Sequence, residues 1–261
     1  MRKLLILGCG WVGESFAEWV QQYDVEIYAT VTSEEKALRL RAKGLRAEVY
    51  NFDQSASFPF EKERFDFVLN SIPASKKLTV DHIQKRFDQV ANILSKLDYG
   101  KHVYLSSIGI YPEETRNFDE SYTQYDTMSA ELLQAENAMQ SLANTVIFRL
   151  GGLFGKQRIF AKYFAGRVCP SGEQSANFIH VDDVVKLIWL SLTHNLSERL
   201  YNVVCPEHPK KELVVRASAH KYGFDLPTAF TSERSYDKVV DGNKLTRELN
   251  YTFVYPNPIH F

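Results

Sequence analysis

The sequence has 261 residues and a mass of 30.0 kDa, which is enough to bury a large core without disulfides or metals. Its 31 Lys and Arg residues nearly balance 32 Asp and Glu residues, so nucleic acid or an anionic membrane is not expected as a partner. No apolar stretch is as long as a transmembrane helix, and the apolar run at residues 4–7 is too short for a signal peptide.

The three cysteines, Cys9, Cys169 and Cys205, lie far apart in the sequence. No pair of them has the spacing of a metal site or a redox motif. We therefore expect three reduced thiols, no bound metal and a cytoplasmic location.

Apolar stretches and amphipathic stretches alternate through the first 150 residues. The clearest helix covers residues 81–97, because Ile83, Phe87, Val90 and Leu94 recur at steps of three or four. Strands that are almost continuously apolar and alternate with helices predict an α/β fold, a doubly wound parallel sheet of the Rossmann type. The expected strands are residues 3–7, 25–31, 45–52, 65–69, 102–105 and 145–150, and the expected helices are residues 11–23, 33–43, 81–97 and 129–142.

This alternation ends after residue 150, where three glycines follow within five residues. We expect a Rossmann domain over residues 1–150 and a small lobe over residues 151–261. No flexible linker separates the two parts, so they can also count as one domain. The expected elements of the lobe are helices over residues 181–192, 211–221 and 241–249 and a strand over residues 201–204.

A glycine-rich segment, here called the glycine loop (residues 8–13, GCGWVG), lies between the first expected strand and the first expected helix. Glycines in the pattern G-x-G-x-x-G at this place are typical of dinucleotide binding. The first permits a tight turn, the second lets backbone N–H groups reach a pyrophosphate, and the third lets the helix pack on the strand. The alternative is a glycine-rich turn without a ligand. The predicted cofactor-binding residues of this loop are Gly8, Gly10, Trp11, Val12 and Gly13.

The second expected strand ends without the acidic residue that usually binds the adenosine ribose. The hydroxyls of Thr32 and Ser33, with Lys36 one turn on, are placed to receive a 2′-phosphate instead. This pattern favours NADP as the cofactor, with NAD as the alternative. Thr32 and Ser33 could also cap the next helix, and the two roles are compatible.

Three further segments follow in order, YLSSIGIY at residues 104–111, FRLGGLFG at 148–155 and FIHVDDV at 178–184. Together with the glycine loop they resemble the extended short-chain dehydrogenase/reductase superfamily, the NAD(P)-dependent epimerase/dehydratases. The resemblance covers nearly the whole chain, and the short length is most similar to atypical members of that superfamily.

The resemblance implies roles for individual residues of this chain. Ser107, four residues before Tyr111, matches the catalytic hydroxyl, and Arg158 matches an arginine that meets substrate phosphate. Asp53 matches an acid that hydrogen-bonds adenine. The residues implied to line the ribose and nicotinamide half of the cofactor are Asn70, Ser71, Ile72 and Pro73.

The sequence departs from the superfamily at its catalytic Tyr-x-x-x-Lys pair. No lysine occurs between Lys101 and Lys156, and counting back from Glu136 places Met128 and Leu132 at the two positions. Tyr125 lies just upstream and is the candidate proton donor. A tyrosine without a cation beside it is a poor base at neutral pH.

Each candidate has a structural alternative. Ser107 could satisfy backbone groups of its loop. Tyr111 could contact substrate or close the loop before Pro112, and Tyr125 could be a packed aromatic instead of a proton donor. His180 could move protons in a substrate site or be a structural histidine.

The residues therefore predict an NAD(P)-binding oxidoreductase or epimerase/dehydratase-like enzyme that acts on a polar small molecule such as a nucleotide sugar. The lobe over residues 151–261 would bind the substrate, and a homodimer is compatible with the sequence. The alternative is a catalytically silent dinucleotide sensor or regulatory protein, because the Tyr/Lys pair is missing. Motifs of hydrolases, metalloenzymes and P-loop NTPases do not occur.

Overall fold

The computed structural model describes residues 1–54, 56–75, 77–233 and 236–261. The chain divides into two compact units, and each unit is assembled from three stretches of sequence. The predicted boundary after residue 150 falls at the end of a strand, and the division into a Rossmann domain and a substrate lobe stays a prediction. The first unit contains residues 1–110, 128–148 and 188–200, and the second contains residues 111–127, 149–187 and 201–261.

Seven strands form the central sheet in the order β11-β7-β5-β4-β1-β2-β3. Strand β1 pairs in parallel with a neighbour on each side, so that Leu5 lies opposite both Tyr28 and Val68. The predicted doubly wound parallel sheet is confirmed. Its strands are β1 (Arg2–Leu7), β2 (Val25–Val31), β3 (Arg46–Val49), β4 (Arg64–Asn70), β5 (Asp98–Ser107), β7 (Thr145–Leu150) and β11 (Leu200–Val203).

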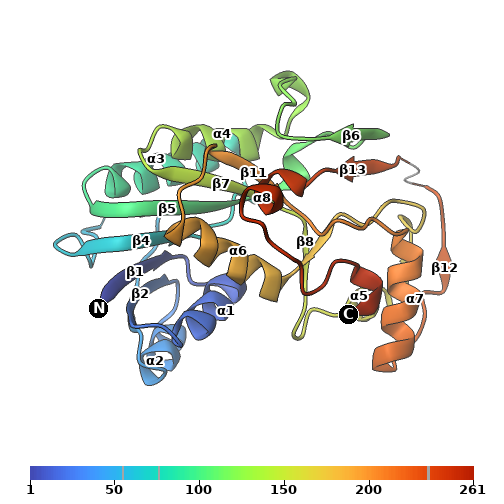
Figure 1. Cartoon of the computed structure of the whole chain (residues 1–261), viewed down its shortest axis with the longest axis horizontal. Coiled ribbons are helices and arrows are strands. Elements are labelled where there is room, and N and C mark those ends of the chain that lie inside the picture. The colour runs from blue at the N-terminus through green and yellow to red at the C-terminus, as the bar shows by residue number, and fades with distance from the viewer. Residues whose placement is uncertain (55, 76, 234–235) are drawn as a thin grey trace. The chain divides into compact units, whose positions relative to one another are not determined.

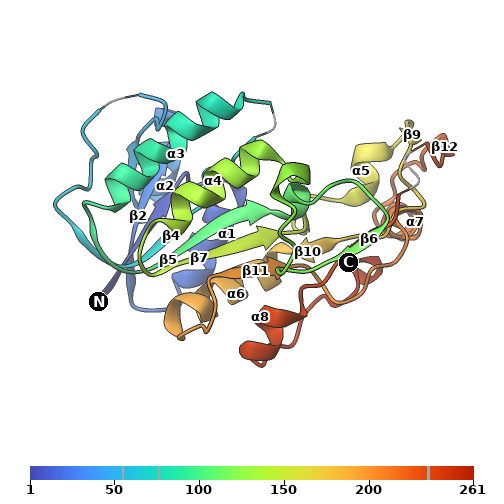
Figure 2. The same ribbon diagram turned by 90° about the horizontal axis from the view of Figure 1, so that it is seen from above.

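Helices cover both faces of this sheet in the first unit (Figures 1 and 2). Helices α1 (Trp11–Val20) and α2 (Glu34–Ala42) lie on one face, and α3 (Val80–Leu94) and α4 (Ala130–Gln140) lie on the other. This arrangement follows from the strand order, because the chain winds outward from β1 in one direction and then from β4 in the other. The carboxyl ends of β1 and β4 therefore meet where the winding reverses.

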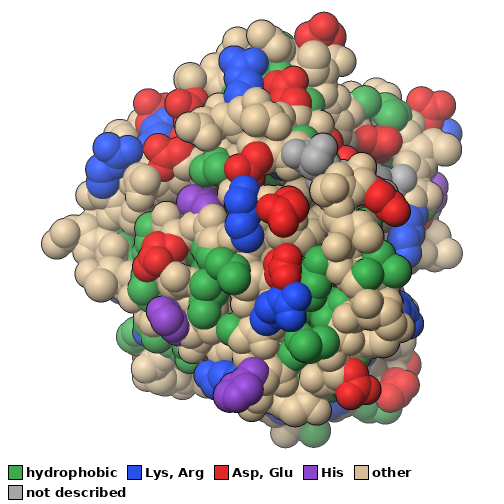
Figure 3. Space-filling view, turned by 90° about the vertical axis from the view of Figure 1, so that its right-hand side faces the viewer, with side chains coloured by type: hydrophobic (Ala, Val, Ile, Leu, Met, Phe, Trp, Pro, Cys, Tyr) green, Lys and Arg blue, Asp and Glu red, His purple; other side chains and the backbone are tan. Residues whose placement is uncertain are grey.

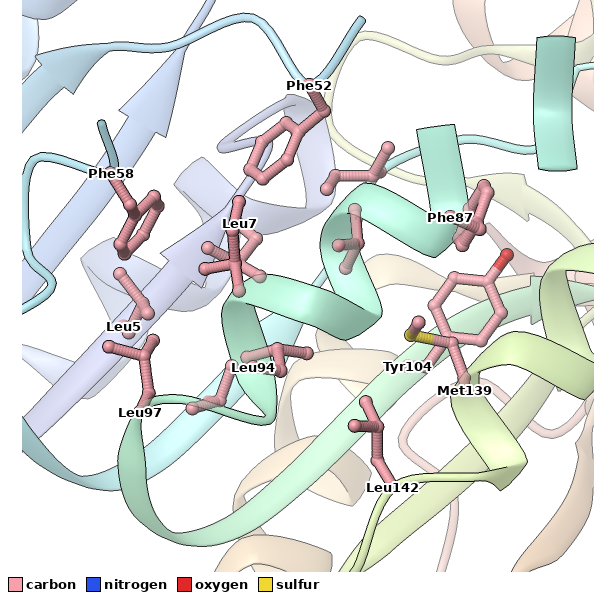
Figure 4. Close-up of a cluster of buried hydrophobic side chains, with 14 of the residues drawn as sticks. Leu5, Leu7, Phe52, Phe58, Phe87, Leu94, Leu97, Tyr104, Met139 and Leu142 are labelled. Atoms are coloured by element: carbon pink, nitrogen blue, oxygen red, sulfur yellow. The ribbon is translucent and has the colours of Figure 1, made fainter. Parts of the chain in front are cut away.

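The core of the first unit lies where α3 and α4 pack on the sheet (Figure 4). Ile83, Phe87, Val90 and Leu94, the predicted apolar stripe of α3, are all fully buried. Burying one such side chain contributes about 1.5–3 kcal/mol. Strand β3 is shorter than predicted, since the chain turns after Val49 and carries its next aromatic residues into this core.

The second unit contains three short parallel strand pairs, β6 with β13, β8 with β10 and β9 with β12. Strands of two or three residues are too short to show a period in the sequence, so none was predicted. Their bounds are β6 (Arg116–Phe118), β8 (Gly152–Phe154), β9 (Val168–Cys169), β10 (Phe178–His180), β12 (Ala229–Phe230) and β13 (Lys238–Val240).

The helices of the chain's carboxyl-terminal half lie close to their predicted positions. Helix α6 begins in the second unit and ends in the first, where its Trp189 packs against Trp19 of α1 with ring centroids 6.2 Å apart. The remaining helical elements are α5 (Phe160–Phe164), α6 (Val181–Thr193), α7 (Lys211–Tyr222), α8 (Asn243–Glu248) and the 3₁₀ turns η1 (Ile108–Ile110), η2 (Tyr125–Thr127) and η3 (Pro258–His260).

Asp183, in the first turn of α6, is fully buried. Its carboxylate accepts hydrogen bonds from the Tyr251 hydroxyl at 2.7 Å and from the Val254 and Tyr255 amides at 2.7 and 3.1 Å. A buried carboxylate needs such donors, because removing a charge from water is costly. Asp183 therefore fixes the segment 251–255 to α6, a contact that its position in the sequence does not reveal.

The surface is mixed in charge. On the face shown in Figure 3, acidic and basic side chains alternate with exposed apolar ones. Across residues 1–54, 56–75, 77–233 and 236–261, no helix has the length and apolar character needed to cross a membrane. The same residues contain no group of three or more His, Cys, Asp and Glu side chains that could hold a metal ion.

Candidate dinucleotide-binding site

The glycine loop connects β1 to α1 by a turn that requires glycine at its first position. Gly8 has a φ of +66°, and its N–H donates to the Thr30 hydroxyl at 2.9 Å. A Cβ at Gly8 would stand 3.0 Å from the Ile72 side chain. The Ser71 hydroxyl donates to the Gly8 carbonyl at 2.7 Å. The turn is thus held between β2 and the loop that follows β4.

The other two glycines of the loop differ in their surroundings. A Cβ at Gly13 would lie 3.1 Å from Ile6 and 3.3 Å from the Ser71 hydroxyl, so Gly13 permits the close packing of α1 on the sheet. A Cβ at Gly10 would meet only the Gly8 carbonyl, at 3.7 Å. Gly10 is the N-cap of α1, and no side chain caps that helix end. Nothing in the described chain therefore requires glycine at position 10, whereas a phosphate held against the backbone would.

Beside this loop, β2 ends at Val31, and the two residues that follow it, Thr32 and Ser33, are both exposed. Ser33 is the N-cap of α2, and its hydroxyl accepts a hydrogen bond from the Lys36 amide at 3.4 Å. The capping role considered for Ser33 is therefore present. It uses one lone pair of the hydroxyl and leaves its proton able to bind an anion.

Two cations of α2 converge on one carboxylate of α1. Lys36 Nζ lies 2.9 Å from Glu14 Oε1, and Arg39 Nη2 lies 2.9 and 3.0 Å from the two Glu14 oxygens. Sequence reasoning identified Lys36 but missed Arg39 and Glu14. The spacing of Lys36 and Arg39 at i and i+3 on one helix face was a signal for a shared partner.

Asp53 follows β3 and forms the centre of a second charged cluster. Arg86 Nε and Nη2 donate to its two oxygens at 2.7 and 2.6 Å, and His82 Nε2 lies 3.0 Å from Oδ1. The hydrogen bonds from Arg86 hold the pKa of Asp53 below its usual value, against the opposing effect of burial. These side chains line a cavity of about 410 Å³ together with Phe52, Gln54, Lys85 and Gln89.

The residues after β4 shape the loop that faces Gly8. The Asn70 side chain is fully buried, accepts from the Ile72 amide at 3.1 Å and donates to the Met139 sulfur at 3.3 Å. Ser71 is bonded to Gly8, and the Pro73 carbonyl accepts from Arg86 at 3.4 Å. The structure thus brings Ser71 and Ile72 to the glycine loop, while the Asn70 side chain serves the shape of the turn.

Ser107 ends β5, and its hydroxyl accepts from the Gly109 amide at 3.0 Å. This is the backbone contact considered as an alternative role, and it leaves the hydroxyl proton able to donate. A Cβ at Gly109 would stand 3.2 Å from the Ser107 hydroxyl and 3.7 Å from Leu132. Leu132 and Met128, which the count back from Glu136 predicts to stand in place of the superfamily's Tyr and Lys, are both buried apolar side chains.

The neighbouring Ser106 was not singled out in the sequence. Its hydroxyl donates to the buried Glu136 carboxylate at 2.6 Å. This hydrogen bond ties the end of β5 to α4 directly behind Ser107. The close spacing of Ser106 and Ser107 gave no signal as to which hydroxyl points into the core.

The tyrosine candidates belong to the second unit. Tyr125 begins η2 and is 58% exposed. Tyr111 is buried, its hydroxyl donates to the Asn202 side chain at 2.9 Å, and Arg149 donates to that hydroxyl at 2.9 Å. Burial raises the pKa of Tyr111 despite the nearby Arg149. The Tyr111 hydroxyl is thus bonded within the second unit, and a contact with substrate stays a prediction for this residue.

Arg158 and His180 come together around Gly155 in the second unit. The Arg158 amide donates to the Gly155 carbonyl at 3.0 Å, and a Cβ at Gly155 would lie 2.4 Å from His180 Nε2. The His180 ring packs against the Tyr255 ring at a tilt of 36°, with centroids 3.8 Å apart, and its Nδ1 accepts from the Asp182 amide at 3.1 Å. Burial lowers the pKa of His180. His180 thus has packing and hydrogen-bond contacts within the second unit, and its role towards a substrate stays a prediction.

Comparison with known families now adds to this geometry. Residues 4–204 match the sequence profile of the family described as NAD dependent epimerase/dehydratase. The chain belongs to this family. The resemblance inferred from the glycine loop and the three later segments is thereby confirmed.

Individual relatives of the epimerase/dehydratase family show how far the likeness extends. The chain is 24% identical to protein YeeZ of Escherichia coli K12 over 99% of this chain and 98% of that protein. It has the fold of the Bacillus cereus UDP-glucuronic acid 4-epimerase, solved with UDP-glucuronic acid and NAD, at 13% identity and a TM-score of 0.77 over 99% of this chain and 96% of that one. The human epimerase family protein SDR39U1, solved with NADPH, gives 15% identity and a TM-score of 0.73 over 98% and 96%.

Proposed function

We propose that this protein is an NADP-dependent enzyme of the epimerase/dehydratase family that acts on a polar small molecule, with a nucleotide sugar as the first candidate. The observation that carries the proposal is Gly10. It is a glycine at the uncapped end of α1 with open space where a side chain would be. The backbone amides and the helix dipole there favour an anion, as the pyrophosphate of a dinucleotide requires.

The adenosine end of the cofactor would lie towards Asp53. The cavity of about 410 Å³ there combines an aromatic wall, Phe52, with the carboxylate of Asp53 and the amide of Gln89. A purine fits this chemistry, because its face can stack and its amino group can donate to a carboxylate. Asp53 would then share its oxygens between adenine and Arg86.

NADP is proposed over NAD because of the groups at the end of β2. Thr32 and Ser33 are exposed hydroxyls, and Lys36 and Arg39 are cations on the adjoining turns of α2. Both cations contact one carboxylate, Glu14, so the positive groups at this corner converge on a single anion. A 2′-phosphate would be favoured there, and the ribose-binding carboxylate that selects NAD is missing from the strand end.

The nicotinamide half would follow the loop after β4. Ser71 and Ile72 contact the glycine loop directly, so their backbone continues the surface on which the dinucleotide would lie. When bound, the cofactor supplies hydride transfer. Asn70 would act by holding the turn, and Pro73 by limiting its backbone freedom.

Ser107 is the proposed catalytic hydroxyl. Its oxygen accepts from Gly109, so its proton can donate to a carbonyl or hydroxyl oxygen of the substrate. Tyr125 is the proposed second proton donor, and its exposed phenol is accessible. Tyr111, Arg158 and His180 stay proposed substrate-binding residues, with Arg158 as the group for a substrate phosphate.

Two further expectations stay proposals. The described cysteines are free and buried, and burial raises the pKa of Cys9 and of Cys205 to about 12 each, so these thiols are unreactive at neutral pH. Reduced thiols of this kind support a cytoplasmic location. A homodimer stays the proposed assembly.

The binding part of the proposal is tested by calorimetric titration of the whole chain with NADP, NADPH, NAD and NADH. We expect the protein to bind both NADP(H) and NAD(H), with a lower dissociation constant for NADP(H). Gly10→Asp should weaken both at least about 100-fold, because a carboxylate would occupy the phosphate position and repel it. Unfolding in urea checks that Gly10→Asp still folds, and unchanged binding by a folded Gly10→Asp protein would contradict the proposed site.

The catalytic part is tested with a panel of nucleotide sugars and small carbonyl compounds. We expect turnover with at least one class and a fall in kcat of about 100-fold in Ser107→Ala, the size usually lost with a positioned proton donor. Tyr125→Phe should lower kcat less, because the Tyr125 side chain is 58% exposed and solvent water can replace its phenol as a proton donor. Serine at 106 offers a matched control, since Ser106→Ala removes a neighbouring hydroxyl that is bonded to Glu136 instead.

A second candidate function is a dinucleotide-binding protein without catalysis. The observation that favours it is the burial of Met128 and Leu132 where relatives carry Tyr and Lys. It predicts tight NADP binding, no turnover across the panel and a change of oligomeric state or partner affinity on binding. Turnover that depends on Ser107 would eliminate it.

A further inference from the structure

The cluster of Glu14, Lys36 and Arg39 contains a carboxylate at the place where the proposed function puts a phosphate. Lys36 and Glu14 are largely buried side chains, 26% and 19% exposed, and Arg39 is 58% exposed. Both cations contact the same carboxylate in the described structure. Glu14 thus already occupies the charges that an incoming anion would need.

A second ion pair between the same two helices lies one turn further along α1. Glu18 Oε1 lies 2.8 Å from Lys43 Nζ, with both side chains about half exposed at 47% and 42%. This pair joins one carboxylate to one ammonium at the far end of α2, away from Thr32 and Ser33. At Glu14, two cations of α2, Lys36 and Arg39, face the same carboxylate beside Thr32 and Ser33.

The chemistry of the three side chains makes exchange of the anion feasible. Arg39 is the exposed partner of Glu14, and an ion pair that solvent reaches from one side contributes little, about 1 kcal/mol, so it can open at small cost. A phosphate monoester carries up to two charges and three acceptor oxygens, and it binds arginine and lysine more strongly than one carboxylate does. The displaced Glu14 carboxylate would remain in contact with solvent near the helix end, where the dipole of α1 favours it.

We infer that Glu14 is an internal competitor for the 2′-phosphate of NADP, and that it sets how strongly the protein prefers NADP over NAD. This inference rests on the proposed function. NADP binding exchanges Glu14 for the 2′-phosphate on Lys36 and Arg39, whereas NAD, which has hydroxyls there, leaves the Glu14 ion pairs intact. Glu14 is a specificity-determining residue in this account, since it weakens one dinucleotide selectively.

The experiment compares wild-type protein with Glu14→Gln, using Glu18→Gln as the matched control on the same helix. The dissociation constants of NADP and NAD are measured by calorimetry, together with those of 2′,5′-ADP and 5′-AMP, which carry only the adenosine end. We expect the ratio of the NAD constant to the NADP constant to rise about fivefold in Glu14→Gln, as removal of one nearby negative charge allows. The same rise should appear between 5′-AMP and 2′,5′-ADP, and Glu18→Gln should stay within about twofold of wild type.

Two further measurements separate competition from a general effect on folding. The rise in the ratio of the NAD to the NADP dissociation constant in Glu14→Gln should shrink in about 0.5 M salt, where charges more than a few ångströms apart are screened. It should also vanish when Lys36→Gln and Arg39→Gln are added to Glu14→Gln, because no cations remain to be released. Circular dichroism and thermal unfolding verify that each variant is folded.

The possible failures are distinguishable. If wild-type protein binds neither dinucleotide, the proposed function fails and this inference fails with it. If wild-type protein binds both and the ratio in Glu14→Gln is unchanged or falls, the proposed site stands and Glu14 is only a structural link or a residue that orients the cations. If the ratio of the two dissociation constants rises as much in Glu18→Gln as in Glu14→Gln, the inference is also overturned. The rise would then reflect the net charge of the protein.

Discussion

Two glycine-rich segments of this chain use the same residue for opposite purposes. In the glycine loop of the first unit, a Cβ at Gly10 would meet only one backbone oxygen, at 3.7 Å. The segment over residues 151–155 of the second unit differs. An added Cβ would lie 2.7 Å from the Val204 side chain at Gly151, 2.4 Å from Phe178 at Gly152 and 2.4 Å from His180 at Gly155. The first segment leaves space at Gly10, whereas the three glycines of the second segment are all closed by the protein's own side chains.

This difference shows what a run of glycines can and cannot indicate. Glycine is required wherever something approaches the backbone closely, and that something can be a ligand or another part of the chain. In the second segment it is the side chain of Val204, Phe178 or His180. At Gly10 no such neighbour is present in the described chain, so the reason for glycine there lies with a bound molecule. The following predictions test this contrast, beginning with the largest effect.

Gly155→Ala should destabilise the protein by about 3 kcal/mol. The φ of Gly155 is +113°, which a side chain disfavours, and the added Cβ would collide with His180 Nε2. The free energy of unfolding from urea titration measures the effect. A loss below about 1 kcal/mol would mean that His180 moves aside easily and that the second segment is less tightly closed than the structure indicates.

Asp183→Asn should destabilise the protein by about 2 kcal/mol, since two backbone amides and the Tyr251 hydroxyl lose a charged acceptor. The Tyr255 ring, which packs against His180 beside Gly155, is held through this carboxylate. Urea unfolding compares the variant with Tyr251→Phe, which removes one donor and leaves the charge. Tyr251→Phe should cost about 1 kcal/mol. Equal losses in the two variants would show that the charge of Asp183 does not matter.

His102, a buried histidine of the first unit outside the glycine loop, should make the free energy of unfolding depend on pH. The ring is fully buried, and burial lowers its pKa to about 3. The unfolded chain protonates this histidine near pH 6.5, whereas the folded chain does not, so stability falls as the pH falls from about 6.5 to about 3. The slope from this residue approaches about 1.4 kcal/mol per pH unit. Urea unfolding between pH 7 and pH 5 should show a flatter dependence in His102→Gln, and an unchanged slope would contradict a neutral buried ring.

Gly10→Ala should change the free energy of unfolding by no more than about 1 kcal/mol, since alanine is only a poorer N-cap than glycine and meets no clash. Its expected effect is on binding, with NADP weakened at least about tenfold by a methyl group between the backbone and the phosphate. Calorimetry and urea unfolding on the same sample measure both quantities. A large loss of stability with unchanged binding would reverse the comparison between the two segments.

Much of the first unit followed from local sequence alone. The apolar strands, the stripe Ile83, Phe87, Val90 and Leu94 and the place of the glycine loop all depend on periodicities within a few residues. The helix cap at Ser33 is equally local. Such features are encoded in short windows because backbone geometry repeats every two or 3.6 residues.

The charged clusters of the candidate site were not visible in this way. Arg86 binds Asp53 across 33 residues, and Arg39 binds Glu14 across 25. The sequence showed each ionisable group but not which of the many opposite charges would be its partner. The same holds for Ser106 and Glu136, 30 residues apart.

The parallel sheet, the glycine loop and the family of the chain could all be predicted from the residues, because repeating patterns and a motif of fixed spacing carry that information. Only the tertiary structure decided which glycines face open space, that Asp183 holds the segment 251–255, and that Lys36 and Arg39 share Glu14. Those features depend on contacts between residues far apart in the chain, and their geometry is fixed only when the strands and helices pack together.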